Sequence, residues 1–217
     1  MAAQQNASMP LARGDDERGF SKMSILLLDG SPSNPSRSAA LLDAVAERLG
    51  GRGPLIERLR IRELPAQPLL LADGSNRAIR AAIDLVLDVS AVVIATPVYK
   101  AAYSGLLKVF LDLLPQTALR SKAVLPLATG GSPHHMLALD YALRPVLQSL
   151  SARQVLPGIY AIESQVTLLP EGGHHVGADV ASRLDDAVAN LVFEHHRSAA
   201  VLTPFRPVPF EQVRCSV

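Results

Sequence analysis

Four serines and one arginine lie within the short segment 29–38, which reads DGSPSNPSRS. The segment separates an apolar run from a stretch with helical spacing, so backbone N–H groups and a helix dipole converge there. Ser31, Ser36 and Ser38 add hydroxyl donors, and Arg37 adds a permanent positive charge. This combination predicts a phosphate-binding loop. The alternative is a serine-rich helix cap that binds nothing.

The segment lacks both common nucleotide-binding signatures. It is not GxxxxGK[ST], which disfavours triphosphate hydrolysis, and it is not GxGxxG, which disfavours binding of a dinucleotide pyrophosphate. A phosphate on another kind of ligand is therefore expected.

Two further segments suit a planar ligand. Segment 96–105, TPVYKAAYSG, combines a turn at Pro97 with the flat rings of Tyr99 and Tyr103 and the charge of Lys100. Segment 128–135, ATGGSPHH, has paired glycines, which let a backbone approach a planar ring closely. The alternative for segment 96–105 is that its tyrosines only pack over the end of the sheet. The alternative for segment 128–135 is an ordinary glycine turn.

Five apolar runs, which we interpret as strands, alternate with five helical patterns. The expected strands are 24–30, 55–61, 91–97, 123–131 and 154–164. The expected helices are 36–51, 75–90, 103–115, 134–150 and 179–197, and 165–178 is interpreted as a loop. The alternation predicts an α/β fold with a doubly wound, five-stranded parallel sheet and helices on both faces.

Five strands favour the flavodoxin-like order 2-1-3-4-5 over the six-stranded dinucleotide-binding order. In such sheets ligands bind outside the carboxyl ends of the strands. The three segments described above follow strands one, three and four, so we expect them to meet at one edge.

Composition narrows the class of protein. The 217 residues are 48% hydrophobic and 19% charged with a net charge of +1, which allows a large core and gives no electrostatic reason to expect nucleic acid or acidic membranes. No apolar run reaches the roughly 18 residues that span a bilayer. The N-terminal 22 residues lack the apolar core of a secretion signal. The single cysteine, Cys215, excludes an internal disulfide, and a cytoplasmic location is expected.

The chain is expected to divide into three parts. Residues 1–22 are interpreted as a flexible leader, 23–197 as one domain, and 198–217 as a tail in which several prolines prevent regular structure.

Four motifs together resemble a known family. GSPSNPSRS, ATPVYKAAYSGLLKVFLDLLP, LPLATGG and LDYALRPVL are similar, in order and spacing, to the NAD(P)H-dependent FMN reductases of two-component monooxygenase systems, above all those that serve alkanesulfonate desulfonation. The resemblance covers roughly residues 24–197. It implies a flavodoxin-like subunit, usually dimeric or tetrameric, that reduces FMN with NADPH or NADH. The reduced flavin then passes transiently to a monooxygenase that cleaves the C–S bond of a sulfonate.

The resemblance also implies roles for individual residues. The FMN phosphate would be held by Ser31, Ser36, Arg37 and Ser38. The isoalloxazine would be lined by Pro97, Val98, Tyr99, Lys100, Thr129, Gly130 and Gly131. Many members have arginine at the position of Ser33, so Arg37 would carry the charge alone and FMN would bind more weakly.

No catalytic side chain is expected beyond these binding groups. Hydride transfer to flavin needs a stacked nicotinamide and little acid–base help. The histidine pairs at 134–135, 174–175 and 195–196 lack the HExxH spacing, so no metal site is predicted.

Segment 134–150 contains Pro145, which has no N–H for the carbonyl of Tyr141. The helix is therefore expected to kink or bulge there. In related reductases this segment lies at a subunit interface near the flavin. We hypothesise that Tyr141 touches the flavin site of a neighbouring subunit and governs flavin exchange, the alternative being a role in packing alone. Helices 103–115 and 134–150 are apolar nearly all the way round, which favours a homo-oligomer built through both.

Two rival functions share the fold. FMN-bound quinone, azo or chromate reductases tend to carry PEYN where this chain has PVYK. Electron-transfer flavodoxins are typically strongly acidic, whereas this chain is nearly neutral.

Overall fold

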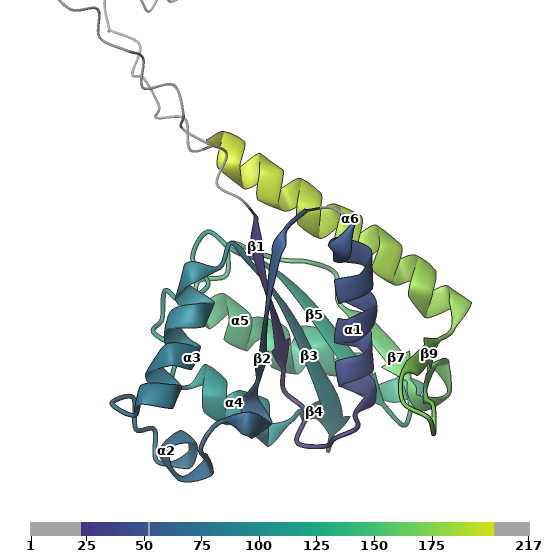
Figure 1. The fold of residues 1–217 in the computed structure, drawn as a ribbon, viewed down its shortest axis with the longest axis horizontal. Coiled ribbons are helices and arrows are strands. Elements are labelled where there is room, and N and C mark those ends of the chain that lie inside the picture. Colours follow the sequence, from purple (N-terminus) through teal and green to yellow (C-terminus); the bar gives the residue numbers. More distant parts are fainter. Residues whose placement is uncertain (1–22, 52, 202–217) are drawn as a thin grey trace, which may run out of the picture.

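A parallel sheet forms the centre of the computed structural model, which describes residues 23–51 and 53–201 (Figure 1). The expected leader, 1–22, and residues 202–217 of the expected tail lie outside the described residues. Among the described residues no helix is both long and apolar enough to cross a membrane.

The strand order of the sheet is the expected one. The parallel strands are β1 (Ser24–Asp29), β2 (Leu55–Arg60), β3 (Ala91–Tyr99), β5 (Ala123–Gly130), β6 (Gln154–Val155) and β7 (Ile159–Ile162). They pair in the order β2-β1-β3-β5, and both β6 and β7 then pair with β5. This confirms the order 2-1-3-4-5, with β6 and β7 together in the fifth place.

The expected number of five strands is wrong, because the sheet has seven. Pro157 and Gly158 separate β6 from β7, and a proline cannot donate to a strand ladder. The short β4 (Ala102–Tyr103) adds an antiparallel partner at the end of β3. Tyr103, expected to begin a helix, therefore lies in a strand.

Helices cover both faces of the sheet. One face packs against α1 (Arg37–Gly50) and α6 (Ala178–Val201), and the other against α3 (Arg77–Asp88), α4 (Gly105–Leu111) and α5 (Arg144–Ser149) (Figure 1). Alternate residues of the strands point to opposite faces, so the sheet separates two apolar clusters. A short helix, α2 (Ala66–Leu70), was not expected from the sequence. The expected helix 103–115 is shorter than predicted, since α4 ends at Leu111.

The expected helix 134–150 is divided into three. It consists of the 3₁₀ turn η2 (Pro133–His135), the π-helical segment η3 (Ala138–Leu143) and α5. A bulge ahead of Pro145 was predicted, and the π-helical segment confirms it. The proline leaves the carbonyl of Tyr141 without the usual donor four residues on, which favours a wider turn.

The expected loop 165–178 contains a hairpin instead. The turn η4 (Glu163–Gln165) leads into β8 (Val166–Leu168), which pairs antiparallel with β9 (His174–Val176). Gly172 and Gly173 both have positive φ, a conformation that glycine adopts without strain, and so close the turn. The last helix, α6, continues to Val201 and so passes the expected domain end at 197.

Candidate functional site

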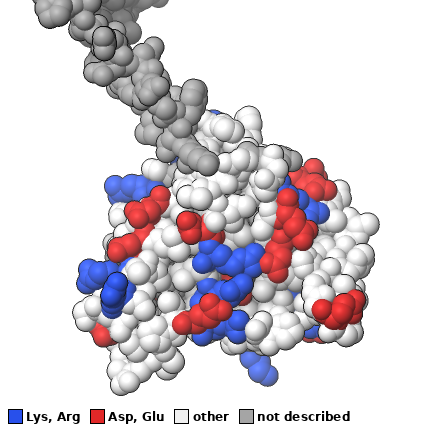
Figure 2. All heavy atoms as spheres, viewed as in Figure 1, with Lys and Arg blue, Asp and Glu red and all other residues white. Residues whose placement is uncertain are grey.

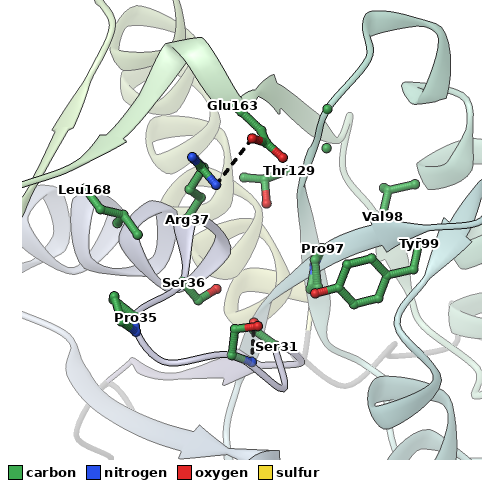
Figure 3. A pocket seen from close by; sticks show the side chains of 13 residues that line it. Ser31, Pro35, Ser36, Arg37, Pro97, Val98, Tyr99, Thr129, Glu163 and Leu168 are labelled. Atoms are coloured by element: carbon green, nitrogen blue, oxygen red, sulfur yellow. Dashed lines mark hydrogen bonds and ion pairs between the residues drawn. The ribbon is translucent and has the colours of Figure 1, made fainter.

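A cavity of about 310 Å³ opens at the carboxyl edge of the sheet, between the loops that follow β1, β3, β5 and β7 (Figure 3). We call it the edge cavity. It is lined by Ser31, Ser33, Pro35, Ser36, Arg37, Pro97, Val98, Tyr99, Thr129, Gly130, Gly131, Glu163 and Leu168. These side chains come from segments far apart in the sequence, which the parallel sheet brings to one edge.

The first wall is the loop that enters α1. Ser36 is the N-cap of this helix, and its hydroxyl accepts a hydrogen bond from the Ala39 N–H at 3.4 Å. The hydroxyl oxygens of Ser36 and Ser38 lie 2.9 Å apart. Ser38 is fully buried and does not line the cavity, so it orients Ser36 from beneath. The first N–H groups of α1 have no acceptor inside the helix, so this end of α1 suits an anion.

Ser31 fixes the start of the same loop. Its backbone N–H donates to the Asp29 carboxylate at 2.9 Å, and its hydroxyl accepts from the Ser33 N–H at 3.2 Å. Burial raises the pKa of Asp29, while the bond from Ser31 acts in the opposite direction. The hydroxyl hydrogen of Ser31 is left to donate toward the cavity, since the bond from Ser33 uses only the oxygen.

Arg37 carries the positive charge of the edge cavity. Its Nη1 lies 3.5 Å from the Glu163 carboxylate (Figure 3), and its buried Nε has no hydrogen-bond partner among the described residues. An orphaned guanidinium donor is costly to bury, so it indicates that a ligand atom accepts there. Glu163 adds the one carboxylate among the described residues that line the cavity.

The second wall is the end of β3. Pro97 pairs in register with Thr129 of β5, which places the two expected ring-binding segments side by side. Tyr99 is half exposed at the end of the strand. Lys100 and Ala101 both have positive φ and form the two-residue turn to β4, as type I′ hairpins require. Lys100 is exposed and does not line the edge cavity.

Buried hydroxyls join the first two walls. The Ser104 hydroxyl donates to the Gly30 carbonyl at 2.5 Å and caps α4 by accepting from the Leu107 N–H at 3.1 Å. The Ser104 N–H donates to the Thr96 hydroxyl at 2.9 Å. These bonds fix the loop after β1 relative to the loop after β3.

The third wall is the glycine pair after β5, and only one of its two glycines is crowded. A Cβ at Gly130 would collide with the Tyr160 hydroxyl, which donates to the Ser132 carbonyl at 2.6 Å. A Cβ at Gly131 would make an ordinary contact of 3.7 Å with Glu163. The sequence interpretation assigned both glycines to close approach of a ring, whereas Gly130 is required by Tyr160 within the chain.

Nine of the eleven residues proposed from the sequence line the edge cavity, and the other two are Ser38 and Lys100. Four lining residues were missed as binding residues, namely Ser33, Pro35, Glu163 and Leu168. Ser33 and Pro35 lie inside the motif already singled out. Glu163 and Leu168 follow the fifth strand, and no sequence signal marked that loop as part of a site.

Comparison with known proteins agrees with this geometry. The family model of the NADPH-dependent FMN reductases matches residues 23–167. The FMN reductase (NADPH) of Escherichia coli K12 is 41% identical over 178 residues, which cover 81% of this chain and 91% of that enzyme. This chain belongs to the NADPH-dependent FMN reductase family. It is accordingly an oxidoreductase that uses NAD(P)H and FMN.

Other similar proteins support the same family and fold. The NADH-dependent FMN reductase SfnE of Pseudomonas putida is 34% identical over 148 residues, covering 66% of this chain and 79% of that enzyme. The apo crystal structure of the NADH:FMN oxidoreductase EMOB superposes with a TM-score of 0.72 at 40% identity, covering 79% of this chain and 89% of that one. An archaeal flavodoxin with 9% identity and a TM-score of 0.55, covering 80% of this chain and 99% of its own, shows the flavodoxin-like fold alone.

The residues of the edge cavity fit FMN, the flavin of the family. The orphaned Nε of Arg37 and the N-terminus of α1 suit its phosphate, and Pro97, Tyr99 and the glycine pair suit a flat ring. Among the described residues, no group of three or more His, Cys, Asp or Glu is placed to hold a metal ion.

Tyr141 lies outside the edge cavity of its own chain. It is 79% exposed on the π-helical segment and lines a separate shallow pocket with Ala101, His134, His135 and Leu137. Met136 and Leu137 are each 55% exposed beside it. By contrast, Leu107, Phe110 and Leu111 of α4 are buried within the monomer. Of the two segments expected at a subunit interface, 134–150 therefore has the more exposed large apolar side chains.

Proposed function

We propose that this reductase takes FMN as a dissociable substrate and supplies reduced FMN, in the cytoplasm, to a separate flavin-dependent monooxygenase that desulfonates organosulfonates. The main support for this proposal is the small positive charge of the edge cavity. Arg37 is the one cationic side chain among the described residues that line the edge cavity, and Glu163 already pairs with it. A phosphate held by one shared guanidinium leaves more readily than one held by two.

The residues of the edge cavity bind FMN and orient its ring. The hydroxyls of Ser31 and Ser36 and the guanidinium of Arg37 hold the phosphate, while Pro97 and Tyr99 lie along the ring. Bound FMN supplies the hydride-accepting chemistry, with NADPH or NADH as donor. The binding residues therefore need to hold two planar rings together and to exclude water, without a side-chain acid or base.

The partner is inferred from motif likeness. The four motifs quoted above resemble those of reductases that serve alkanesulfonate desulfonation. The relatives compared above are named as FMN reductases, which is consistent with free FMN as the acceptor.

The test is steady-state oxidation of NADPH by purified protein with FMN varied from none to saturation. We expect a nearly colourless protein whose activity depends on added FMN. In a coupled assay with a purified alkanesulfonate monooxygenase and octanesulfonate, sulfite should be released in proportion to the reductase added. A yellow protein that retains FMN and reduces quinones or azo dyes, but not free FMN, would overturn the proposal.

We further propose a homo-oligomer in which Tyr141 touches the flavin site of a neighbouring subunit and governs flavin exchange. Its exposed position on the π-helical segment supports this, since π-bulges cluster at functional sites. Tyr141→Ala should change the FMN dissociation constant or the turnover number severalfold, whereas Phe193→Ala, at a 62% exposed aromatic of α6, should change neither. If both quantities are unchanged in Tyr141→Ala, the functional role is wrong.

A further inference from the structure

A second cavity, of about 400 Å³, lies on the other side of the phosphate-loop segment, between α1 and the edge strand β2. We call it the arginine cavity because Arg58, Arg60 and Arg62 line it. Basic side chains gather over β2 in the middle of this face, with acidic ones beside them (Figure 2). Ser33, Pro35, Ser36 and Leu168 line both cavities, so the two adjoin.

The position of the arginines follows from the sheet. Arg58 and Arg60 are alternate residues of β2 and so point to the same face, and Arg62 follows in the 3₁₀ turn η1 (Ile61–Glu63). Arg60 pairs in register with Asp29, the residue at which β1 gives way to the phosphate loop. The carboxyl end of β2 thus brings guanidinium groups beside the edge where the flavin family binds its ligands.

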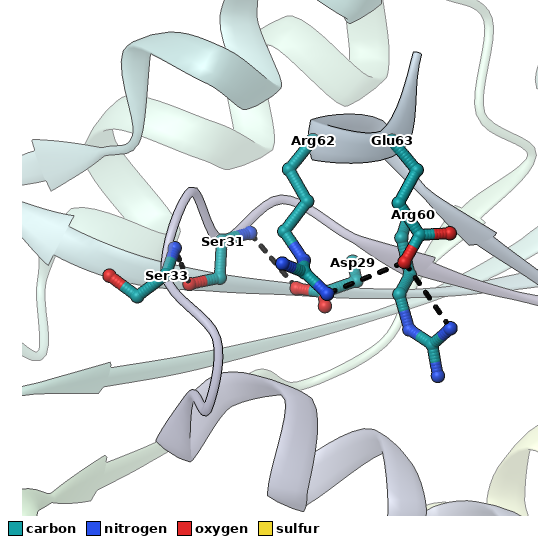
Figure 4. Close-up of polar contacts among 6 residues, drawn as sticks. All are labelled: Asp29, Ser31, Ser33, Arg60, Arg62 and Glu63. Atoms are coloured by element: carbon teal, nitrogen blue, oxygen red, sulfur yellow. Dashed lines mark hydrogen bonds and ion pairs between the residues drawn. The ribbon is translucent and has the colours of Figure 1, made fainter.

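The positive charge of Arg60 and Arg62 is only partly matched. Both lie near one oxygen of Glu63, at 3.5 and 3.3 Å, so two guanidinium groups face a single carboxylate (Figure 4). Arg58 differs, because it pairs with Asp43 of α1 at 2.5 Å. Asp29 is also in the wall, where burial raises its pKa and the charges of Arg62, Arg60 and Arg58 act in the opposite direction. Arg60 and Arg62 therefore have donors left for an anion.

We propose that the arginine cavity binds the 2′-phosphate of NADPH, with Arg60 and Arg62 as the residues that distinguish NADPH from NADH. Guanidinium groups suit a phosphate dianion because their N–H groups can bond two of its oxygens at once. A ligand that already reaches the flavin can extend into an adjoining cavity, which favours the nicotinamide cofactor over a free anion. The inference rests on the proposed use of a nicotinamide cofactor at the edge cavity.

The kinetic test compares the wild type with Arg60→Gln/Arg62→Gln, both side chains being partly exposed. We expect KM for NADPH to rise at least about tenfold, which corresponds to about 1.4 kcal/mol. KM for NADH should change less than twofold and kcat should stay constant with both donors. Glu63→Gln removes the competing carboxylate and should lower KM for NADPH. Arg120→Gln is the control. It removes an exposed charge just before β5, at the amino ends of the strands, and should change none of these values.

A binding test needs no turnover. Calorimetric titration with adenosine 2′,5′-bisphosphate, with FMN at saturation, should give binding to the wild type that the double variant loses. Adenosine 5′-monophosphate and inorganic phosphate should bind at least about tenfold more weakly.

Equal effects of the double variant on NADPH and NADH would overturn the proposal, as would unchanged binding of the bisphosphate. Inorganic phosphate that binds as tightly as the bisphosphate would make this a site for a free anion. Binding of the bisphosphate that is seen only when FMN is left out would place it in the edge cavity instead. A protein that binds the bisphosphate through these arginines but does not reduce FMN would contradict the proposed function and leave the site standing.

Discussion

The Tyr160 hydroxyl leaves no room for a side chain at Gly130. Because a Cβ at position 130 would overlap the Tyr160 hydroxyl, Gly130→Ala should lower the free energy of unfolding by about 2 kcal/mol. Tyr160→Phe should cost about 1 kcal/mol through its lost hydrogen bond to the Ser132 carbonyl. In the Tyr160→Phe background, Gly130→Ala should cost clearly less, since the hydroxyl is gone. Urea unfolding of the wild type, the two single variants and the double variant measures this coupling.

Gly131→Ala is the matched control, because its Cβ would make only an ordinary contact. Equal costs of Gly130→Ala with and without the Tyr160 hydroxyl would show that the hydroxyl is not what excludes a side chain at this position.

Some residues of the edge cavity could be predicted from the sequence, and others could not. Ser31, Ser36 and Arg37 could be predicted to share a cavity wall because a strand–loop–helix junction fixes where such side chains lie. Ser38 has the same chemistry but lies on the buried side of the helix turn, which its residue type does not reveal. Glu163 could not be predicted, since its approach to Arg37 depends on how the chain turns after β7.

At the scale of elements, Ser104 joins the loop after β1 to the start of α4. Ser104→Ala removes a helix cap and leaves the buried Gly30 carbonyl without its donor. The free energy of unfolding should fall by about 2 kcal/mol. Ser149→Ala, whose hydroxyl bonds within its own helix at an exposed position, should change it by less than about 0.5 kcal/mol. A comparable, small effect of both substitutions in urea unfolding would count against this role of Ser104.

The elements that could be predicted are those with a local cause. Most of the main strands are apolar runs, although β2 (LIERLR) contains three charged residues. The π-helical segment follows from a proline whose missing N–H affects the carbonyl of Tyr141. The hairpin β8–β9 and the short β4 could not be predicted. Their strands have only three or two residues, which is too short for a recognisable sequence pattern, and each forms only by pairing with another strand. The fifth strand was divided by Pro157 and Gly158, a visible signal that the sequence interpretation overlooked.

At the scale of the whole molecule, the exposed apolar surface around the π-helical segment is the proposed contact between subunits. Leu137 is 55% exposed there, so an aspartate should be tolerated in the monomer but not in an apolar interface. Leu137→Asp should lower the sedimentation coefficient to that of a monomer. Leu70→Asp, at a 69% exposed leucine of α2, should leave it unchanged. A wild type that already sediments as a monomer would contradict the proposed oligomer.

The proposed function requires FMN to bind in the edge cavity through Arg37, against the competing carboxylate of Glu163. The most direct measurement is the FMN dissociation constant, from quenching of flavin fluorescence, for the wild type, Arg37→Ala and Glu163→Gln. Removing the guanidinium should weaken binding roughly ten- to a hundredfold. Removing the carboxylate should tighten it roughly three- to tenfold, because the phosphate no longer competes with a charge 3.5 Å from Arg37. Asp84→Asn, an exposed charge on α3, is the control. Opposite shifts are the predicted result, and an unchanged constant in Arg37→Ala would contradict the assignment of this cavity to FMN.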